Sequence, residues 1–120
     1  MADIQECLDR VMSIDGAIAA ALADYSSGMC LGTAGGTKSF NPEVAAAGNS
    51  EVVRSKLRVM QSLELADEIE DILITLGKEY HLIFPLKGGD LFLYAALRRE
   101  QANLALTRHK MAQIAKELVV

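Results

Sequence analysis

Aromatic residues are scarce in this sequence of 120 residues: it contains no tryptophan, and tyrosine and phenylalanine together make up only 5% of it, although 51% of the residues are hydrophobic. The core must therefore be built from aliphatic side chains. A chain of this length buries roughly two thirds of the surface that its unfolded form exposes, which is enough for a core without disulfides or metals. We therefore expect one globular domain over residues 1–120.

Long apolar runs and clusters of basic residues are also missing. No run approaches the ~18 apolar residues of a transmembrane helix, and the N-terminus "MADIQECLDR" mixes acidic with apolar residues where a secretory signal would carry a basic segment. The formal net charge is -4 and the basic residues are scattered, which is unlike a nucleic-acid-binding surface. We expect a cytoplasmic protein that binds no nucleic acid and does not insert into membranes.

Residues with catalytic or metal-binding chemistry are few and dispersed. The two cysteines, Cys7 and Cys30, have neither CxxC spacing nor a histidine cluster nearby, so we expect free, partly buried thiols. His81 and His109 lie in different predicted elements, and no carboxylate or cysteine stands at triad or metal-site spacing from either. The "GTAGG" stretch lacks the spacing of a phosphate-binding loop. We therefore predict no catalytic, cofactor-binding or metal-binding residue, and a protein that is not an enzyme.

The first third of the chain predicts a helix and a hairpin. Asp3 with Glu6 three residues later forms a variant capping box, and the apolar spacing after it predicts a helix that ends near Ser13. Residues 16–24 and 29–33 are predicted to be strands joined by a turn at residues 25–28, with "GTAGG" continuing as a loop.

The strand at residues 16–24 consists mostly of alanine, which is a poor strand former. We interpret this composition as a flat surface on which helices pack closely. Alternation along the strand predicts two faces, one with Ala17, Ala19, Ala21 and Ala23 and the other with Ile18, Ala20 and Leu22.

Asn41 followed by Pro42 is a strong helix start, and the helix is predicted to reach about Leu63. Gly48 weakens its middle by ~1 kcal/mol relative to alanine, which we expect to reflect another backbone that passes close by. Arg54 and Arg58 form an i, i+4 pair on this helix. We predict that they bind an acidic partner, the alternative being a solvated helix face.

Three strand-like runs follow between residues 68 and 97, "EIEDILITLG", "YHLIFPL" and "LFLYAAL", with short connections that favour antiparallel neighbours. Pro85 predicts a bulge or an end of pairing. A last helix is predicted over about residues 101–118. Because the runs "ILITL" and "LFLYAAL" do not alternate, both faces of the sheet should be covered, which predicts a three-layer α/β/α sandwich in the order α-β-β-α-β-β-β-α.

This order resembles the Roadblock/LC7 family, with the hairpin "DGAIAAALADYSSGMCLG", the pair "ILITLGKEYHLIFPL" and the closing "ANLALTRHKMAQIAKEL" as its most similar parts. The resemblance covers residues 3–118, and the stand-alone length is similar to single-domain bacterial members of the kind found in actinobacteria. It implies a profilin-like α+β fold and a homodimer in which third strands pair and long helices pack together. It also implies a non-enzymatic module that binds or regulates a Ras-like small GTPase. The alternative is a small-molecule-sensing or scaffold domain of a signalling assembly.

The residues themselves agree with a dimer, since an apolar third strand at a sheet edge would be an aggregation hazard unless it is covered. The predicted interface residues are Val53, Leu57, Met60, Glu70, Ile72 and Ile74. Acidic residues crowd the junction between the long helix and the third strand: Glu64, Asp67, Glu68, Glu70 and Asp71. We expect basic residues of the partner to neutralise them, namely Arg54, Lys56 or Arg58.

Overall fold

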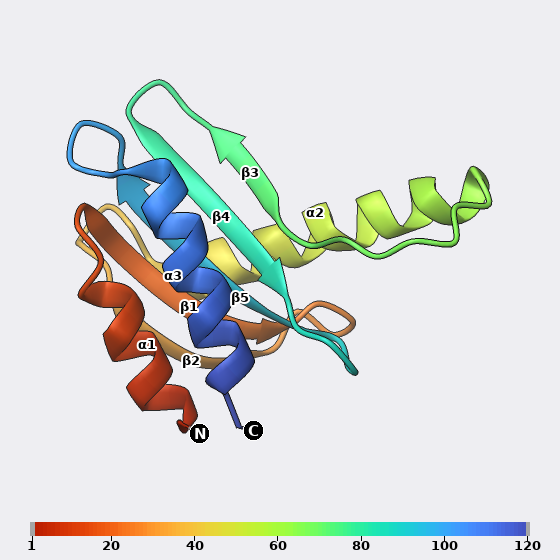
Figure 1. Cartoon of the computed structure of the whole chain (residues 1–120), viewed down its shortest axis with the longest axis horizontal. Coiled ribbons are helices and arrows are strands. Elements are labelled where there is room, and N and C mark those ends of the chain that lie inside the picture. Colours follow the sequence, from red (N-terminus) through yellow and green to blue (C-terminus); the bar gives the residue numbers. More distant parts are fainter. Residues whose placement is uncertain (1, 120) are drawn as a thin grey trace.

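Three helices and five strands follow one another in the predicted order in the computed structural model, which describes residues 2–119. The helices are α1 (Ile4–Met12), α2 (Pro42–Ser62) and α3 (Leu104–Glu117). The strands are β1 (Ala17–Asp24), β2 (Cys30–Gly35), β3 (Ile72–Thr75), β4 (Glu79–Pro85) and β5 (Leu91–Arg98). They form one antiparallel sheet in the order β2-β1-β5-β4-β3, with α1 and α3 on one face and α2 on the other (Figure 1). The predicted α+β sandwich is confirmed.

Side-chain caps fix where the helices begin. The Asp3 carboxylate accepts a hydrogen bond from the Glu6 backbone N–H at 2.9 Å, and the Asn41 side chain accepts one from the Glu43 N–H at 2.9 Å. Both starts agree with the sequence. The start of α3 was predicted wrongly: the helix begins at Leu104, because Asn103 caps it and residues 99–101 form a turn.

The middle of α2 has no close neighbour at Gly48, contrary to the expectation that another backbone passes it. Within residues 2–119, a Cβ built at Gly48 would have no atom within 4 Å.

The alanine strand β1 is buried on both sides, as predicted. Ala19, Ala21 and Ala23 pack under α2, and the opposite face packs against α1 and α3. Ala17 and Ile18 lie on the opposite faces from those predicted: Ile18 is on the α2 side of the sheet and Ala17 is on the other side. A β-bulge between residues 17 and 19 in the pairing with β5 shifts the alternation there.

Strand β2 extends to Gly35 and includes part of the segment that was predicted to be a loop. Gly32 lies within it for a steric reason. A Cβ at this position would stand 3.0 Å from Ile4 Cγ2 and 3.1 Å from Leu8 Cδ1, so the close approach of α1 to this edge strand favours glycine.

Strand β3 is shorter than predicted: it begins at Ile72 instead of residue 68 and pairs with β4 through four residues. Residues 66–71 have no strand pairing and lead from α2 back to the sheet. On β4, Pro85 is the last residue and lies two positions beyond Ile83, the final partner of β3. Pairing with β3 thus stops before the proline, whereas pairing with β5 continues to Pro85, where the strand ends as expected.

Both cysteines are free, as predicted. Cys7 is buried between α1 and α3, and Cys30 is half-buried on β2. Burial raises the pKa of each thiol, which keeps the sulfur protonated and apolar.

Candidate interaction surface

The outer edge of β3 is one of the two open edges of the sheet over residues 2–119. Ile72 pairs with Ile83 and Ile74 with His81, which places both isoleucines on the face where α2 lies. Both side chains are only half-buried, and Leu76 just beyond them is 42% exposed. The strand thus presents unpaired backbone groups together with apolar side chains, as the sequence suggested.

The C-terminal part of α2 projects past the sheet beyond β3 (Figure 1). We call residues 57–63 the α2 overhang. Two of its apolar side chains are largely exposed, Val59 at 47% and Leu63 at 63%. Met60 is buried beside the returning chain, and Leu57 is half-buried against the core on the α2 side of the sheet.

A groove of about 620 Å³ runs between α2 and residues 65–73. Of the predicted interface residues, Met60, Glu70 and Ile72 line it. Val53 is fully buried against the chain's own sheet. Its burial therefore does not require a second copy.

The acidic junction is partly neutralised within the chain. The Arg108 guanidinium on α3 donates to both carboxylate oxygens of Asp71, at 2.7 Å and 2.9 Å from Nη2. From the sequence, basic residues of a partner were expected in this role, and for Asp71 that expectation is wrong. The remaining acidic residues are exposed: Glu64, Asp67, Glu68 and Glu70.

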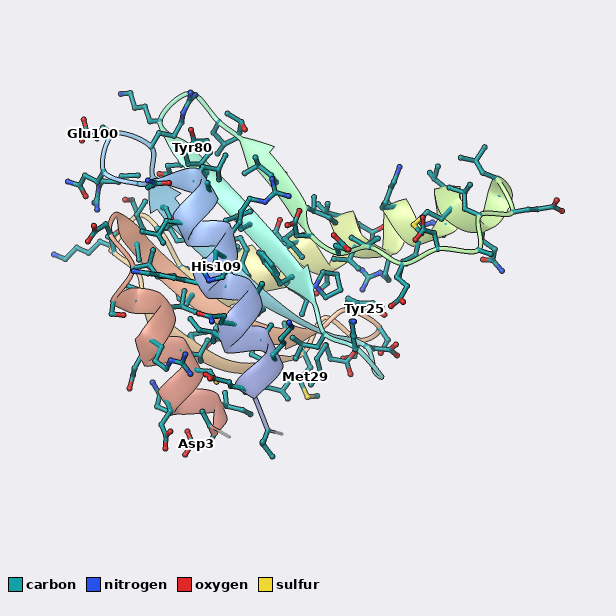
Figure 2. The ribbon with its side chains drawn as sticks, viewed as in Figure 1. Asp3, Tyr25, Met29, Tyr80, Glu100 and His109 are labelled. Atoms are coloured by element: carbon teal, nitrogen blue, oxygen red, sulfur yellow. The ribbon has the colours of Figure 1, made fainter. Side chains whose placement is uncertain are left out.

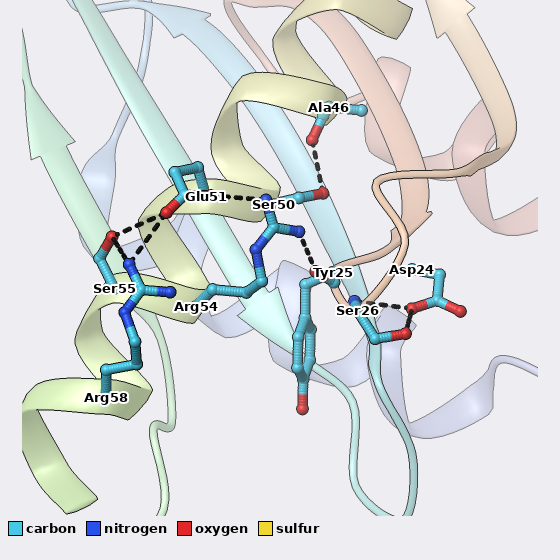
Figure 3. A network of polar contacts seen from close by, with 9 residues as sticks. All are labelled: Asp24, Tyr25, Ser26, Ala46, Ser50, Glu51, Arg54, Ser55 and Arg58. Atoms are coloured by element: carbon cyan, nitrogen blue, oxygen red, sulfur yellow. Dashed lines mark hydrogen bonds and ion pairs between the residues drawn. The ribbon is translucent and has the colours of Figure 1, made fainter.

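Arg54 and Arg58 meet at one carboxylate (Figure 3). Glu51 accepts from Arg54 Nη2 at 2.6 Å and from Arg58 Nη2 at 3.0 Å. These hydrogen bonds hold the pKa of Glu51 at about 2, well below its usual range. Arg54 also donates to the backbone carbonyl of Tyr25, so it anchors the β1–β2 turn to α2. The Arg58 side chain is 62% exposed and reaches solvent.

His81 belongs to a polar chain on the α2 face of the sheet. Its Nε2 lies 2.8 Å from a Glu79 carboxylate oxygen, and its Nδ1 lies 3.2 Å from the Tyr94 hydroxyl. Burial raises the pKa of Tyr94. Both ring nitrogens of His81 thus have hydrogen-bond partners. His109 is exposed on α3 (Figure 2).

Within residues 2–119, no group of three or more histidine, cysteine, aspartate or glutamate side chains is placed to hold a metal ion. No helix within the same range is both long and apolar enough to cross a membrane.

No sequence-family model matches the chain, and no curated protein sequence matches it either. Solved structures do match. MglB from Myxococcus xanthus superposes with a TM-score of 0.82 at 17% identity, covering 93% of this chain and 81% of that one. A Roadblock/LC7 domain from Streptomyces avermitilis gives 0.80 at 16% identity, covering 96% and 93%. This chain has the Roadblock/LC7 fold.

A further structure with the Roadblock/LC7 fold is MglB in a tetrameric arrangement, with a TM-score of 0.66 at 16% identity, covering 94% of this chain and 88% of that one. All three likenesses extend over nearly the whole chain. The fold that the order of elements led us to expect is therefore confirmed.

Proposed function

We propose that this protein is a non-enzymatic, cytoplasmic, homodimeric interaction module that binds a Ras-like small GTPase and modulates its nucleotide cycle. The observation that carries the proposal is the uncovered surface formed by the β3 edge and the α2 overhang on a Roadblock/LC7 fold. An open apolar edge strand of this kind favours aggregation in an isolated protein, and pairing it with another strand prevents this.

The proposed homodimer is supported by two elements that can each contact their equivalent in a second copy, β3 and the α2 overhang. Antiparallel pairing of β3 with the β3 of a second copy would join two five-stranded sheets and cover Ile72 and Ile74. The same two-fold symmetry would bring the two α2 overhangs onto one face, where Leu57 and Met60 meet the partner and Glu70 lies beside the joint. The match to MglB in a tetrameric arrangement favours self-association.

The choice of a small GTPase as the partner rests on the Roadblock/LC7 resemblance of the sequence. The assignment of the residues that contact the partner rests on their charge. Arg54 on α2 binds the β1–β2 turn, and Arg58 lies one helical turn further along α2 with its side chain exposed. We assign direct contact with an acidic partner to Arg58, which exchanges Glu51 for a partner carboxylate. Arg54 holds the turn in place beside it.

Affinity capture tests the proposal. The purified protein is incubated with lysate of its own source in parallel with GDP and with a non-hydrolysable GTP analogue, and bound proteins are identified by mass spectrometry. A small GTPase enriched with one nucleotide is the expected result. Its capture should be weakened by Arg58→Glu and unaffected by Lys110→Glu, a matched charge reversal on exposed α3. Absence of any small GTPase in both runs, with a folded dimer as bait, contradicts the proposal.

A further inference from the structure

Two arginines of this chain bind carboxylates in different geometries. Arg108 donates to Asp71 from two nitrogens, Nε at 3.1 Å and Nη2 at 2.7 Å. Arg58 donates to Glu51 from Nη2 alone, at 3.0 Å, and within residues 2–119 its other guanidinium nitrogens donate no hydrogen bond. A pair joined by two parallel hydrogen bonds is stronger and more fixed in geometry than a pair joined by one. The Glu51–Arg58 pair is therefore the one that can exchange.

The surroundings of Glu51 allow Arg58 to leave without stranding the carboxylate (Figure 3). Oε2 of Glu51 accepts from Arg54 Nη2 at 2.6 Å, and Oε1 accepts from the Ser55 hydroxyl at 3.3 Å. Neither contact involves Arg58, so both remain when its side chain turns away. Arg58 gives up only its bonds from Nη2, to Glu51 and to Ser55 Oγ at 3.1 Å. More than half of the Arg58 side chain is exposed, so water replaces these bonds.

We infer that Glu51 occupies, in the free protein, the place on Arg58 that a carboxylate of the small GTPase takes in the complex. The inference rests on the proposed function and adds to it the residue that sets the affinity. Glu51 lies about two helical turns before Arg58 on α2, so it is always within reach of the guanidinium. A partner carboxylate that takes over Nη2 has to displace it.

This competition selects the kind of group that the partner presents. A group that accepts a single hydrogen bond from Arg58 replaces the bond to Glu51 and gains nothing. Backbone carbonyls and hydroxyls are uncharged and are weaker acceptors than the carboxylate that they would displace. A carboxylate that accepts from two guanidinium nitrogens gains one bond in the exchange, and the planar arginine fork matches it. The partner group is therefore an aspartate or glutamate bound bidentately.

Arg54 does not compete for the same partner group. It donates to the Tyr25 carbonyl as well as to Glu51, so it is held from two sides, and it keeps Glu51 in place after Arg58 has left. The two arginines lower the pKa of Glu51 to about 2, so the competing carboxylate is ionised near neutral pH. The competition is thus independent of pH in that range.

The test measures the Kd of the small GTPase recovered in the affinity capture, used in purified form, by isothermal titration calorimetry. Glu51→Gln removes the competing charge and should bind about twofold to fivefold more tightly than wild type, the factor that one exposed ion pair contributes. Glu43→Gln is the matched control, because it removes the same charge from the same helix at an exposed position about 22 Å from Arg58. Its Kd should equal that of wild type, since this distance exceeds the screening length of about 8 Å in physiological salt.

Arg58→Lys tests the bidentate contact separately. Lysine keeps the positive charge but offers a single nitrogen, so the Kd should rise at least about fivefold over wild type. Circular dichroism checks that each variant is folded.

The outcomes separate this inference from the proposed function. A small GTPase that binds wild type and Glu51→Gln with equal Kd, or wild type and Arg58→Lys with equal Kd, overturns the inference and leaves the proposed function standing. Recovery of no small GTPase in the capture overturns both.

Discussion

Arg108 on α3 forms a two-pronged ion pair with Asp71, in which its Nε donates to Oδ2 at 3.1 Å and its Nη2 to Oδ1 at 2.7 Å. The pair ties α3 to the residue immediately before β3. It thereby fixes one end of the exposed edge strand on which the proposed dimer depends.

Arg108→Ala should therefore loosen β3. Because Arg108 is half-exposed, the expected loss is about 0.5–1 kcal/mol of unfolding free energy, at the upper end for a surface pair because the geometry is bidentate. Urea denaturation measures the loss, and hydrogen exchange should show faster exchange in β3. Lys110→Ala, two residues further along the same helix, is the matched control. Equal stability of the two variants, with unchanged exchange in β3, would show that the pair does not hold the strand.

Arg54 and Arg58 are expected to differ in what their removal does. Arg54→Ala deletes the hydrogen bond to the Tyr25 carbonyl and should lower the unfolding free energy by about 1 kcal/mol. Arg58→Ala removes an exposed side chain and should leave stability nearly unchanged. Denaturant melts of the two variants check this. If Arg58→Ala destabilises as much as Arg54→Ala, the assignment of Arg54 as the anchor is wrong.

Glu51 should make part of the stability dependent on pH. Side-chain hydrogen bonds from Arg54 and Arg58 lower its pKa from 4.5 to about 2. A carboxylate whose pKa is lowered by folding stabilises the protein above its unfolded pKa, and this contribution is lost as pH falls from about 4.5 towards 2. Denaturation midpoints of wild type and Glu51→Gln should thus differ near neutral pH and converge in this acidic window. A difference that persists unchanged at the acidic end would contradict the shift.

Larger side chains on the alanine face of β1 should destabilise the protein. Ala21 is fully buried under α2, so Ala21→Leu should overpack the interface and cost about 1–3 kcal/mol. Ala47→Leu, the same change at an exposed position, should cost nearly nothing. Thermal denaturation followed by circular dichroism compares the two. Equal Tm values would mean that α2 does not pack closely on the alanine surface.

Local chemistry made most of the fold predictable. Asp3 and Asn41 mark the starts of α1 and α2 in the sequence, because a capping side chain binds backbone N–H groups only two or three residues further along the chain. Asn103 carries the same signal for α3 and could have corrected that start. The bulge at residue 18 was beyond prediction, because it arises from pairing with β5 and no local pattern marks it.

The candidate surface was only partly predictable for the same reason. The apolar run at β3 suggested an edge strand, but its length depends on where residues 66–71 leave the sheet. The pairing of Asp71 with Arg108 joins residues 37 positions apart, and nothing in their sequence surroundings indicates it. The sequence reveals the positive charge of Arg54 but not its hydrogen bond to the Tyr25 carbonyl, since that contact forms only in the folded hairpin.

The mass of the protein in solution tests the central claim, that the β3 edge and the α2 overhang form an interface between two copies. Light scattering coupled to size-exclusion chromatography should give twice the chain mass of 13.0 kDa for wild type. Ile74→Lys, which places a charge on the proposed joint, should give the mass of one folded chain. A wild-type mass of one chain at every concentration would contradict the account.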